Sequence, residues 1–231
     1  MASLTFPMAL AGGSSSSISD GYLGQKTLPA LLALSGLVAG NTVTLTGVTS
    51  APPAGIELIH TGSKWYLRQP TRFSLGNVQG LVQAAEQKLT SILIPAPLLA
   101  ACGEVEVESG WWKVGVTNTL SSANVRLGSA NSAADASVFT LASSTINAAN
   151  QYRAILTRHR WASDTGLATK GSADLTGSHT GQLSLVVPLD TVAVPDRTTT
   201  DMYIGWYCSM GVFSDGTGYP GLKGASITLV P

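Results

Sequence analysis

Charged side chains are scarce in this chain. Lys, Arg, Asp and Glu make up 11% of the 231 residues, and 13 basic and 13 acidic side chains give a net charge of zero. A soluble domain usually has about 25% charged residues, and it needs net charge to stay dispersed. One interpretation is a low-charge β-protein. We favour the other, a subunit largely covered by further subunits, because obligate interfaces resemble a domain core cut in half.

The chain also lacks the features of nucleic-acid-binding and membrane proteins. No cluster of Lys or Arg is present, so there is no electrostatic footprint for nucleic acid. The longest apolar run, 28–39, is interrupted by Pro29 and Gly36 and is too short to span a bilayer. Residues 1–19 contain no basic side chain, which argues against a secretory signal peptide. We therefore expect no membrane insertion, and a protein made in the cytoplasm and kept there or released by lysis.

Cysteine and histidine are too few and too dispersed for most catalytic or metal sites. Cys102 and Cys208 are flanked by apolar residues, which favours buried free thiols over a disulfide framework. His60, His159 and His179 lie in separate segments without metal-ligand spacing, and we expect His60 and His179 to be solvated. The sequence has no Gly-x-Ser-x-Gly or phosphate-loop motif. We expect no metal, no cofactor and no catalytic residue.

Short alternating runs predict β-strands from residue 91 onward. Between 91 and 127 we expect strands at 91–94, 103–108, 111–117 and around 125–127. Val105 and Val107 alternate with three glutamates, as in an antiparallel strand with one buried face. In the third run we expect Trp112 to face inward with Val114 and Val116, and Trp111 to face outward.

The later strands follow the same alternation. We expect them at 138–142, 152–161 (with a bulge), 182–187, 201–210 and 225–230. The run 201–210 buries Met202, Ile204, Trp206 and Cys208 and leaves Tyr203 and Tyr207 on the other side. Roughly eight strands without a further helix predict a C-terminal antiparallel jelly-roll sandwich over 91–231.

Three shorter units precede this sandwich. Residues 1–26 read as an arm, either an apolar-tipped anchor or a frayed terminus, because a Gly-Gly-Ser-Ser-Ser-Ser stretch follows a short apolar opening. Residues 27–75 read as a small β-module with a hairpin around Thr61-Gly62-Ser63. The overall fold class is therefore all-β.

Residues 76–90 are predicted to be a helical linker. Apolar residues recur at helical spacing from Val78 to Leu89, and the opposite face is polar. The helix is either a plain packing helix or the neck of a trimer, in which the side chains turned to the axis would be Val78, Val82, Ala85 and Leu89.

Three short segments carry a resemblance to a known class of proteins. They are Ile-Pro-Ala-Pro-Leu-Leu at 94–99, Ser-Ala-Asn-Val-Arg-Leu-Gly at 122–128, and Ala-Ser-Ile-Thr-Leu-Val-Pro at 225–231. Together they look like the C-terminal jelly-roll domains of tailed-bacteriophage structural proteins, such as head fibres, head spikes and tail fibres, and of phage-like particles. The resemblance implies a virion subunit assembled in the host cytoplasm, often a trimer, with an N-terminal anchor on capsid or tail and a distal domain facing the host.

Surface aromatic residues suggest contact with sugar. Trp111, Tyr203 and Tyr207 are expected to point away from the core, where a ring can offer an apolar face to a host-surface glycan. The alternative is that they pack in a subunit interface, where Trp and Tyr are also enriched. A rival interpretation is a monomeric carbohydrate-binding module, which would be a soluble monomer that loses glycan binding in Trp111→Ala.

The third possibility is a polysaccharide hydrolase using Glu104, Glu106 and Glu108. A glycosidase needs two carboxylates about 5–10 Å apart across its substrate, and one strand can provide that spacing. Like-charged neighbours on an exposed sheet are more often a solvated face, so we expect a protein that is not an enzyme.

Overall fold

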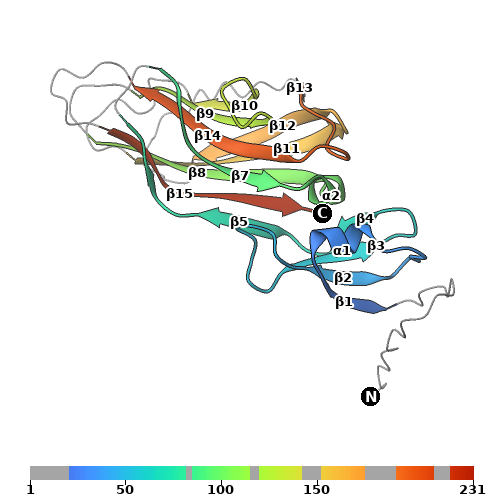
Figure 1. The fold of residues 1–231 in the computed structure, drawn as a ribbon. Coiled ribbons are helices and arrows are strands. Elements are labelled where there is room, and N and C mark those ends of the chain that lie inside the picture. Colours follow the sequence, from blue (N-terminus) through green and yellow to red (C-terminus); the bar gives the residue numbers. More distant parts are fainter. Residues whose placement is uncertain (1–20, 82–84, 115–119, 142–151, 175–190, 211–218) are drawn as a thin grey trace.

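The structure, a computed structural model, describes residues 21–81, 85–114, 120–141, 152–174, 191–210 and 219–231 (Figure 1). The expected strand at 182–187, most of the expected arm, Val82 and His179 lie outside these residues. The regular secondary structure of the described residues is almost entirely β-strand, as predicted. It contains two short helices, and neither is long and apolar enough to cross a membrane.

The N-terminal module is a four-stranded sheet in the order β1-β2-β3-β4. The strands are β1 (Tyr22–Lys26), β2 (Thr42–Leu45), β3 (Ile56–His60) and β4 (Trp65–Leu67), and the helix α1 (Leu28–Leu32) follows β1. β1 runs parallel to β2, and the other pairs are antiparallel. The hairpin predicted around residues 61–63 is confirmed. β1 lies within the segment predicted to be an arm, so this part of the prediction is wrong.

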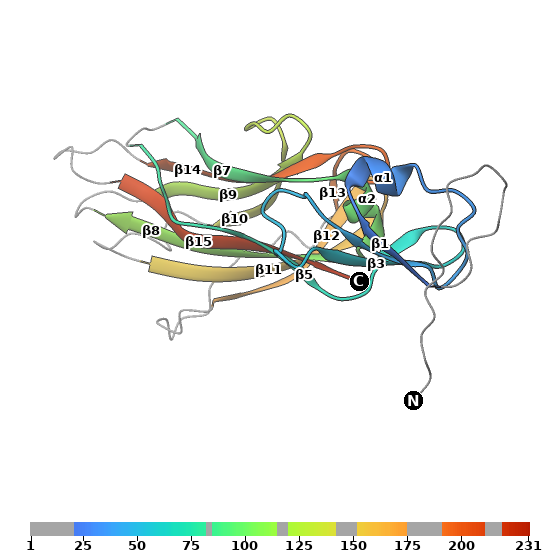
Figure 2. The ribbon, with the colours of Figure 1, turned by 60° about the horizontal axis from the view of Figure 1, so that its bottom comes forward.

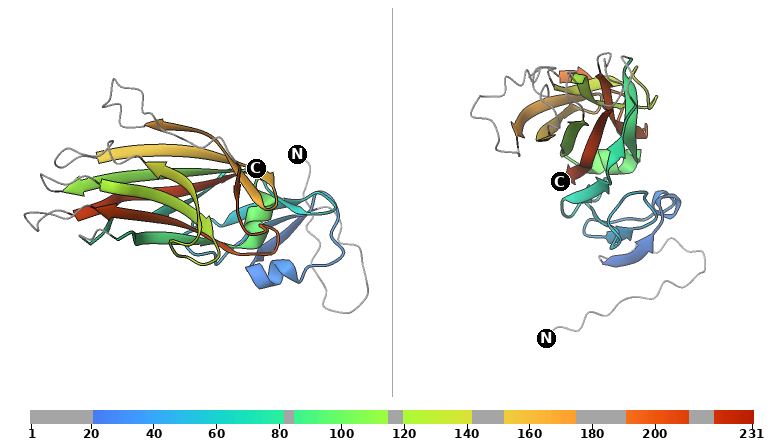
Figure 3. Two further views of the ribbon diagram at one scale, coloured as in Figure 1. Left: turned by 90° about the horizontal axis from the view of Figure 1, so that it is seen from above. Right: turned by 90° about the vertical axis from the view of Figure 1, so that its left-hand side faces the viewer.

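The remaining strands form a sandwich of two sheets (Figures 1 and 3). The smaller sheet has the order β10-β9-β14-β7 and the larger one β13-β12-β11-β8-β15-β5, with β6 also paired to β15. Their bounds are β5 Thr71–Leu75, β6 Val78–Gln79, β7 Gln87–Ile94, β8 Glu104–Val114, β9 Leu120–Gly128, β10 Ala136–Leu141, β11 Tyr152–Ser163, β12 Gly166–Asp174, β13 Thr191–Ala193, β14 Met202–Met210 and β15 Tyr219–Val230.

The strand order is that of a jelly roll. If β5, β7, β8, β9, β10, β11, β14 and β15 are numbered 1 to 8 along the chain, one sheet reads 1-8-3-6 and the other 2-7-4-5. Each step in chain order from 1 to 4 and from 5 to 8 therefore crosses between sheets, as in a double Greek key. β12 and β13 extend the larger sheet beyond β11. The predicted fold class is confirmed, but the sandwich begins at Thr71 rather than at residue 91.

The predicted neck helix is wrong. Val78 and Gln79 form β6, where Val78 is the register partner of Leu222, and β7 already begins at Gln87. The Gly80 N–H donates to the Pro220 carbonyl at 2.8 Å, and a Cβ on Gly80 would lie 2.6 Å from Leu89. A three-turn helix has little stability of its own, so pairing with β15 prevails.

The four residues assigned to the neck therefore share no helical face in the described chain. Val78 and Leu89 are half-buried against the core of their own chain, Ala85 is exposed, and Val82 lies outside the described residues. The trimer that this helix suggested loses its basis in residues 76–90 and stays a prediction from the resemblance alone.

The expected orientation of Trp111 and Trp112 is also wrong. The two strands predicted at 103–108 and 111–117 are one continuous strand, β8. Because β8 does not restart at Gly110, the alternation set by Val105 and Val107 continues. It buries Trp111 and Lys113 completely and leaves Trp112 half-buried, edge-on to Tyr219 with ring centroids 5.2 Å apart.

The helix α2 (Ala96–Ala101) follows β7 in a part of the chain where no further helix was expected. Pro95 precedes the helix and Pro97 lies in its first turn, where a missing N–H costs nothing. The Asp201 carboxylate accepts a hydrogen bond of 2.8 Å from the Ala96 N–H. α2 contacts β4 and lies at the end of the sandwich next to the N-terminal module (Figure 2).

One continuous apolar core joins the module to the sandwich. The buried sets predicted for 201–210 and 225–230 are confirmed: Met202, Ile204, Trp206, Cys208, Ala225, Ile227 and Leu229. Cys102 and Cys208 are free and buried, as expected. β11 has the predicted irregularity, since its register with β12 shifts between Arg158 and His159.

His60 is not solvated, contrary to expectation. It is 7% exposed, accepts a hydrogen bond of 3.1 Å from the Gly62 N–H through Nδ1, and packs edge-on against Trp65. The ring ties the end of β3 to the turn that follows it. Its polar edge satisfies the turn backbone, and the ring face packs against an apolar neighbour.

Candidate functional site

The three aromatic residues predicted to bind ligand do not lie together. Trp111 is fully buried inside the sandwich, so it does not contact a surface ligand. Tyr203 and Tyr207 do face outward, on β14 of the smaller sheet. Tyr203 is half-buried, and Tyr207 is only 2% exposed because other side chains cover it.

Two glycines shape the outer face of the smaller sheet around these tyrosines. Across from β14, β9 places Gly128 beside Tyr203 and Arg126 beside Gly205. A Cβ on Gly205 would lie 2.7 Å from the Tyr207 ring, and one on Gly128 would collide with the Asp135 carboxyl group. The missing side chains thus leave room for a tyrosine ring and a carboxylate directly on the sheet.

An ion pair between Arg126 and Glu86 lies over this face. Arg126 Nη2 is 2.9 and 3.2 Å from the two Glu86 oxygens, and Nη1 donates to the Asp135 carbonyl at 2.9 Å. Asn124 donates a further hydrogen bond to Glu86, and the guanidinium lies 5.8 Å from the centre of the Tyr207 ring. Both charged side chains are less than a fifth exposed, at 18% and 19%. The guanidinium therefore has little capacity left for an anionic ligand.

The hydroxyl of Tyr207, whose ring lies under the Arg126 guanidinium, makes no hydrogen bond with the described residues. It is buried. Burial raises the pKa of the Tyr207 phenol, the Asp135 and Glu86 carboxylates raise it further, and Arg126 opposes them. The hydroxyl therefore keeps its proton at neutral pH and is a donor as well as an acceptor.

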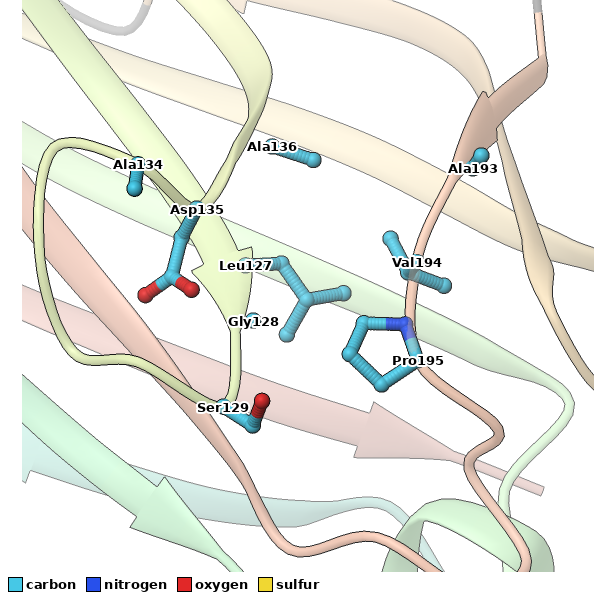
Figure 4. Close-up of a pocket in the computed structure, with 9 residues that line it drawn as sticks. All are labelled: Leu127, Gly128, Ser129, Ala134, Asp135, Ala136, Ala193, Val194 and Pro195. Atoms are coloured by element: carbon cyan, nitrogen blue, oxygen red, sulfur yellow. The ribbon is translucent and has the colours of Figure 1, made fainter.

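A shallow hollow of about 340 Å³ opens at the end of β9 (Figure 4). Val194, Pro195 and Leu127 give it an apolar side, while Asp135 and Ser129 supply the polar groups. The remaining lining residues are small: Gly128, Ala134, Ala136 and Ala193. Its volume is near the lower end of the range for ligand pockets, about 300–1,000 Å³.

Asp135 holds the loop between β9 and β10 in place beside this hollow. Its carboxylate oxygens accept hydrogen bonds from the Ala130 N–H at 3.0 Å and the Ser132 N–H at 3.1 Å. Each oxygen retains a further lone pair for a ligand hydroxyl. The acid is therefore both a structural anchor for the loop and a possible acceptor in the hollow.

The outer face of the larger sheet is a different kind of surface. Glu104, Glu106 and Glu108 lie on one partly exposed side of β8, as predicted. Each carboxylate is paired with a cation from a nearby strand: Arg72–Glu108 at 2.7 Å, Arg158–Glu106 at 2.8 Å, and Lys170–Glu104. This arrangement is a solvated ladder of ion pairs. It does not present a free pair of carboxylates to a substrate.

The buried titratable groups show no reactive site in the described residues. Burial raises the pKa of Cys102 to about 11 and of Cys208 to about 12, so both thiols are protonated and unreactive. Burial also lowers the pKa of Lys113, which lies inside the sandwich near the equally buried Arg153. Among the described residues, no group of three His, Cys, Asp or Glu side chains is placed to hold a metal ion.

Sequence reasoning missed the residues around Tyr207. Arg126 alternates with Val125 and Leu127, so its outward direction was readable from the strand pattern. Glu86 was not readable, because it was assigned to the polar face of a helix that does not form. Asp135 lies in a loop whose closure over Gly128 no local pattern indicates.

Comparisons with known proteins assign no family. No family model and no curated protein matches the chain. Among solved structures, one similar chain comes from the structure of infectious bursal disease virus, Gx strain, at 11% identity and a TM-score of 0.34 over 83% of this chain and 39% of that one. Another is SCLam, a non-specific endo-β-1,3(4)-glucanase of family GH16, at 8% identity and a TM-score of 0.28 over 78% and 76%. At these TM-scores neither likeness indicates a function.

Proposed function

We propose that the protein is a virion structural subunit, a head or tail fibre or spike protein of a tailed bacteriophage or phage-like particle. It works as a homo-oligomer, attaches to the particle through its N-terminal part and presents the sandwich to the host surface, where it contacts glycan. The proposal is supported by the short sequence segments quoted above and by the distribution of charge in the structure. The trimer is part of the same proposal.

The uneven distribution of charge is the observation that carries the proposal. Residues 1–56 contain only two charged side chains, Asp20 and Lys26, and the other 24 of the 26 lie between 57 and 231. The same N-terminal part exposes large apolar side chains, with Leu32 66% and Tyr22 46% accessible. Charged residues are depleted at interface cores and aromatic residues are enriched there. Residues 21–56 of the N-terminal module, which precede the Glu57–Arg68 ion pair, are therefore the part suited to being covered.

The larger sheet, in contrast, is suited to water. Its three ion pairs lie on the outer face, and Arg72 and Arg158 are more than half exposed. Covering such a face would remove these charges from water at a cost that exposed pairs do not repay. A subunit with one charge-poor end and one charged face has a preferred orientation on a particle.

Light scattering at micromolar concentration tests the oligomer. We expect a homo-oligomer for the full chain and a shift toward monomer for Leu32→Asp, which puts a charge on the charge-poor part of the N-terminal module. Leu81→Asp is the matched control, because Leu81 is 71% exposed but adjoins β6 of the sandwich. A stable monomer at this concentration, or equal effects of the two variants, would refute the proposal.

A monomeric carbohydrate-binding module is the second candidate, favoured by the hollow at the end of β9. It predicts glycan binding by a monomer. We further propose that the protein has no hydrolase activity, because each glutamate of β8 is paired with a cation. Release of reducing sugar from a polysaccharide, abolished by Glu106→Gln, would overturn that proposal.

A further inference from the structure

We propose that the hollow at the end of β9 binds a neutral sugar, with Tyr203 beside it as an apolar platform. This inference deepens the proposed function, on whose glycan contact it rests, by naming the site and the class of sugar. It replaces the expected contribution of Trp111, which is buried. It also assigns the polar contacts with the sugar to Ser129 and Asp135.

The shape of the hollow suits a small ring with two unlike sides. A pyranose has an apolar face of C–H groups and a rim of hydroxyls. Val194 and Pro195 form an apolar wall, and the Ser129 hydroxyl and Asp135 carboxylate lie on the other side of the opening (Figure 4). Tyr203 is the register partner of Gly128, which lines the hollow, and the Asp135 carboxyl group lies directly over Gly128.

The polar groups are those that sugar hydroxyls need. Ser129 is exposed and its hydroxyl both donates and accepts. The Asp135 carboxylate accepts one backbone hydrogen bond on each oxygen, which leaves capacity on both.

The charges select neutral sugars over acidic ones. Among the described residues, Asp135 is the only charged one that lines the hollow, and it is negative. Cations on the neighbouring segments are already engaged: Arg126 is bound to Glu86, Lys88 donates to the Asn131 carbonyl, and Arg197 is paired with Asp164. A sugar carboxylate placed beside Asp135 would therefore be repelled without a compensating pair.

The test is a titration of the full chain, followed by saturation-transfer NMR and calorimetry, with lactose and N-acetyllactosamine as neutral probes and sialyllactose as the acidic one. We expect saturable binding of at least one neutral probe and weaker binding of sialyllactose. Ser129→Ala removes one hydrogen bond of about 0.5–1.5 kcal/mol, which corresponds to a roughly two- to twelvefold loss of affinity. Tyr203→Ala should weaken binding by about tenfold or more, and Tyr203→Phe should retain it because the ring remains.

The control variant is Tyr152→Ala, which removes an exposed tyrosine from β11 of the larger sheet and should leave affinity unchanged. Unfolding midpoints confirm that each variant is folded. Absence of saturable binding of either neutral probe, a preference for sialyllactose, or equal affinities in wild type, Tyr203→Ala and Ser129→Ala would overturn the inference. Light scattering separates the two proposals: an oligomer without sugar binding refutes only the site, and a monomer that binds neutral sugar supports the site while refuting the virion subunit.

Discussion

The buried His159 should make the sandwich sensitive to acid. The side chain is 1% exposed and lies between two threonine hydroxyls, with Nε2 2.9 Å from Thr157 Oγ1 and Nδ1 3.0 Å from Thr169 Oγ1. The neutral ring is satisfied there, since it donates through one nitrogen and accepts through the other. Burial lowers the pKa of His159 from its ordinary value of 6.5 to about 4.

The size and sign of the effect follow from proton linkage. As pH falls through about 6.5 the unfolded chain takes up a proton at this position, whereas the folded chain resists until about pH 4. The contribution of His159 to stability is therefore fully present above pH 6.5 and is lost as pH falls toward 4. The pKa of His159 differs by about 2.5 between the unfolded and the folded chain. At about 1.36 kcal/mol per pKa unit, this difference changes the free energy of unfolding by about 3 kcal/mol.

Urea unfolding followed by tryptophan fluorescence measures this loss. The useful quantity is the difference in unfolding free energy between wild type and His159→Gln at one protein concentration, because other titrating groups cancel in it. We expect this difference to fall by about 3 kcal/mol between roughly pH 7.5 and pH 4. His60→Gln, which leaves the Thr157–His159–Thr169 contacts intact, serves as the control for loss of a histidine. A difference that does not change with pH would refute the reasoning.

Three further changes test the packing around the sheets. Ser109→Ala removes the hydroxyl that accepts a hydrogen bond of 2.7 Å from the buried Trp206 Nε1–H. We expect the unfolding free energy to fall by about 1–3 kcal/mol. The same substitution should cost less in a Trp206→Phe background, because no donor is then left without a partner. Arg197→Ala removes a hydrogen bond of 2.8 Å to the Cys102 carbonyl at the end of α2. We expect faster amide hydrogen exchange in residues 96–102. Arg197→Lys should restore little of the protection, because lysine lacks the guanidinium fork. Glu106→Gln breaks an exposed ion pair with Arg158 and should cost at most about 1 kcal/mol, falling further in high salt; a larger loss would contradict the solvated-ladder interpretation.

Strand alternation was reliable in this sequence where one run was long and uninterrupted. The buried sets of β14 and β15 were readable because every second residue from Met202 to Cys208 and from Ala225 to Leu229 is apolar. The same pattern placed Tyr203 and Tyr207 on the outer face. It failed at Gly110, where a glycine was taken for a break although the strand continues and its register fixes the direction of Trp111.

The candidate site was only partly contained in the sequence. Local alternation indicates that Tyr203 and Arg126 face outward, but their neighbours come from distant positions. Glu86 and Asp135 reach the same face because β9 pairs with β14 and because Gly128 and Gly205 leave space on the sheet. No spacing along the chain encodes those approaches.

By itself the sequence determined the all-β class, the antiparallel sandwich and the scarcity of charge at the N-terminal end, since these depend on composition and on a two-residue period. The tertiary structure determined that residues 78–79 and 87–89 form strands and not a helix. There a helical spacing exists, but the Gly80 N–H and the edge of β15 offer backbone pairing that a short helix cannot match. It also decided which aromatic ring meets solvent, because burial depends on the register between strands, which distant pairing partners set.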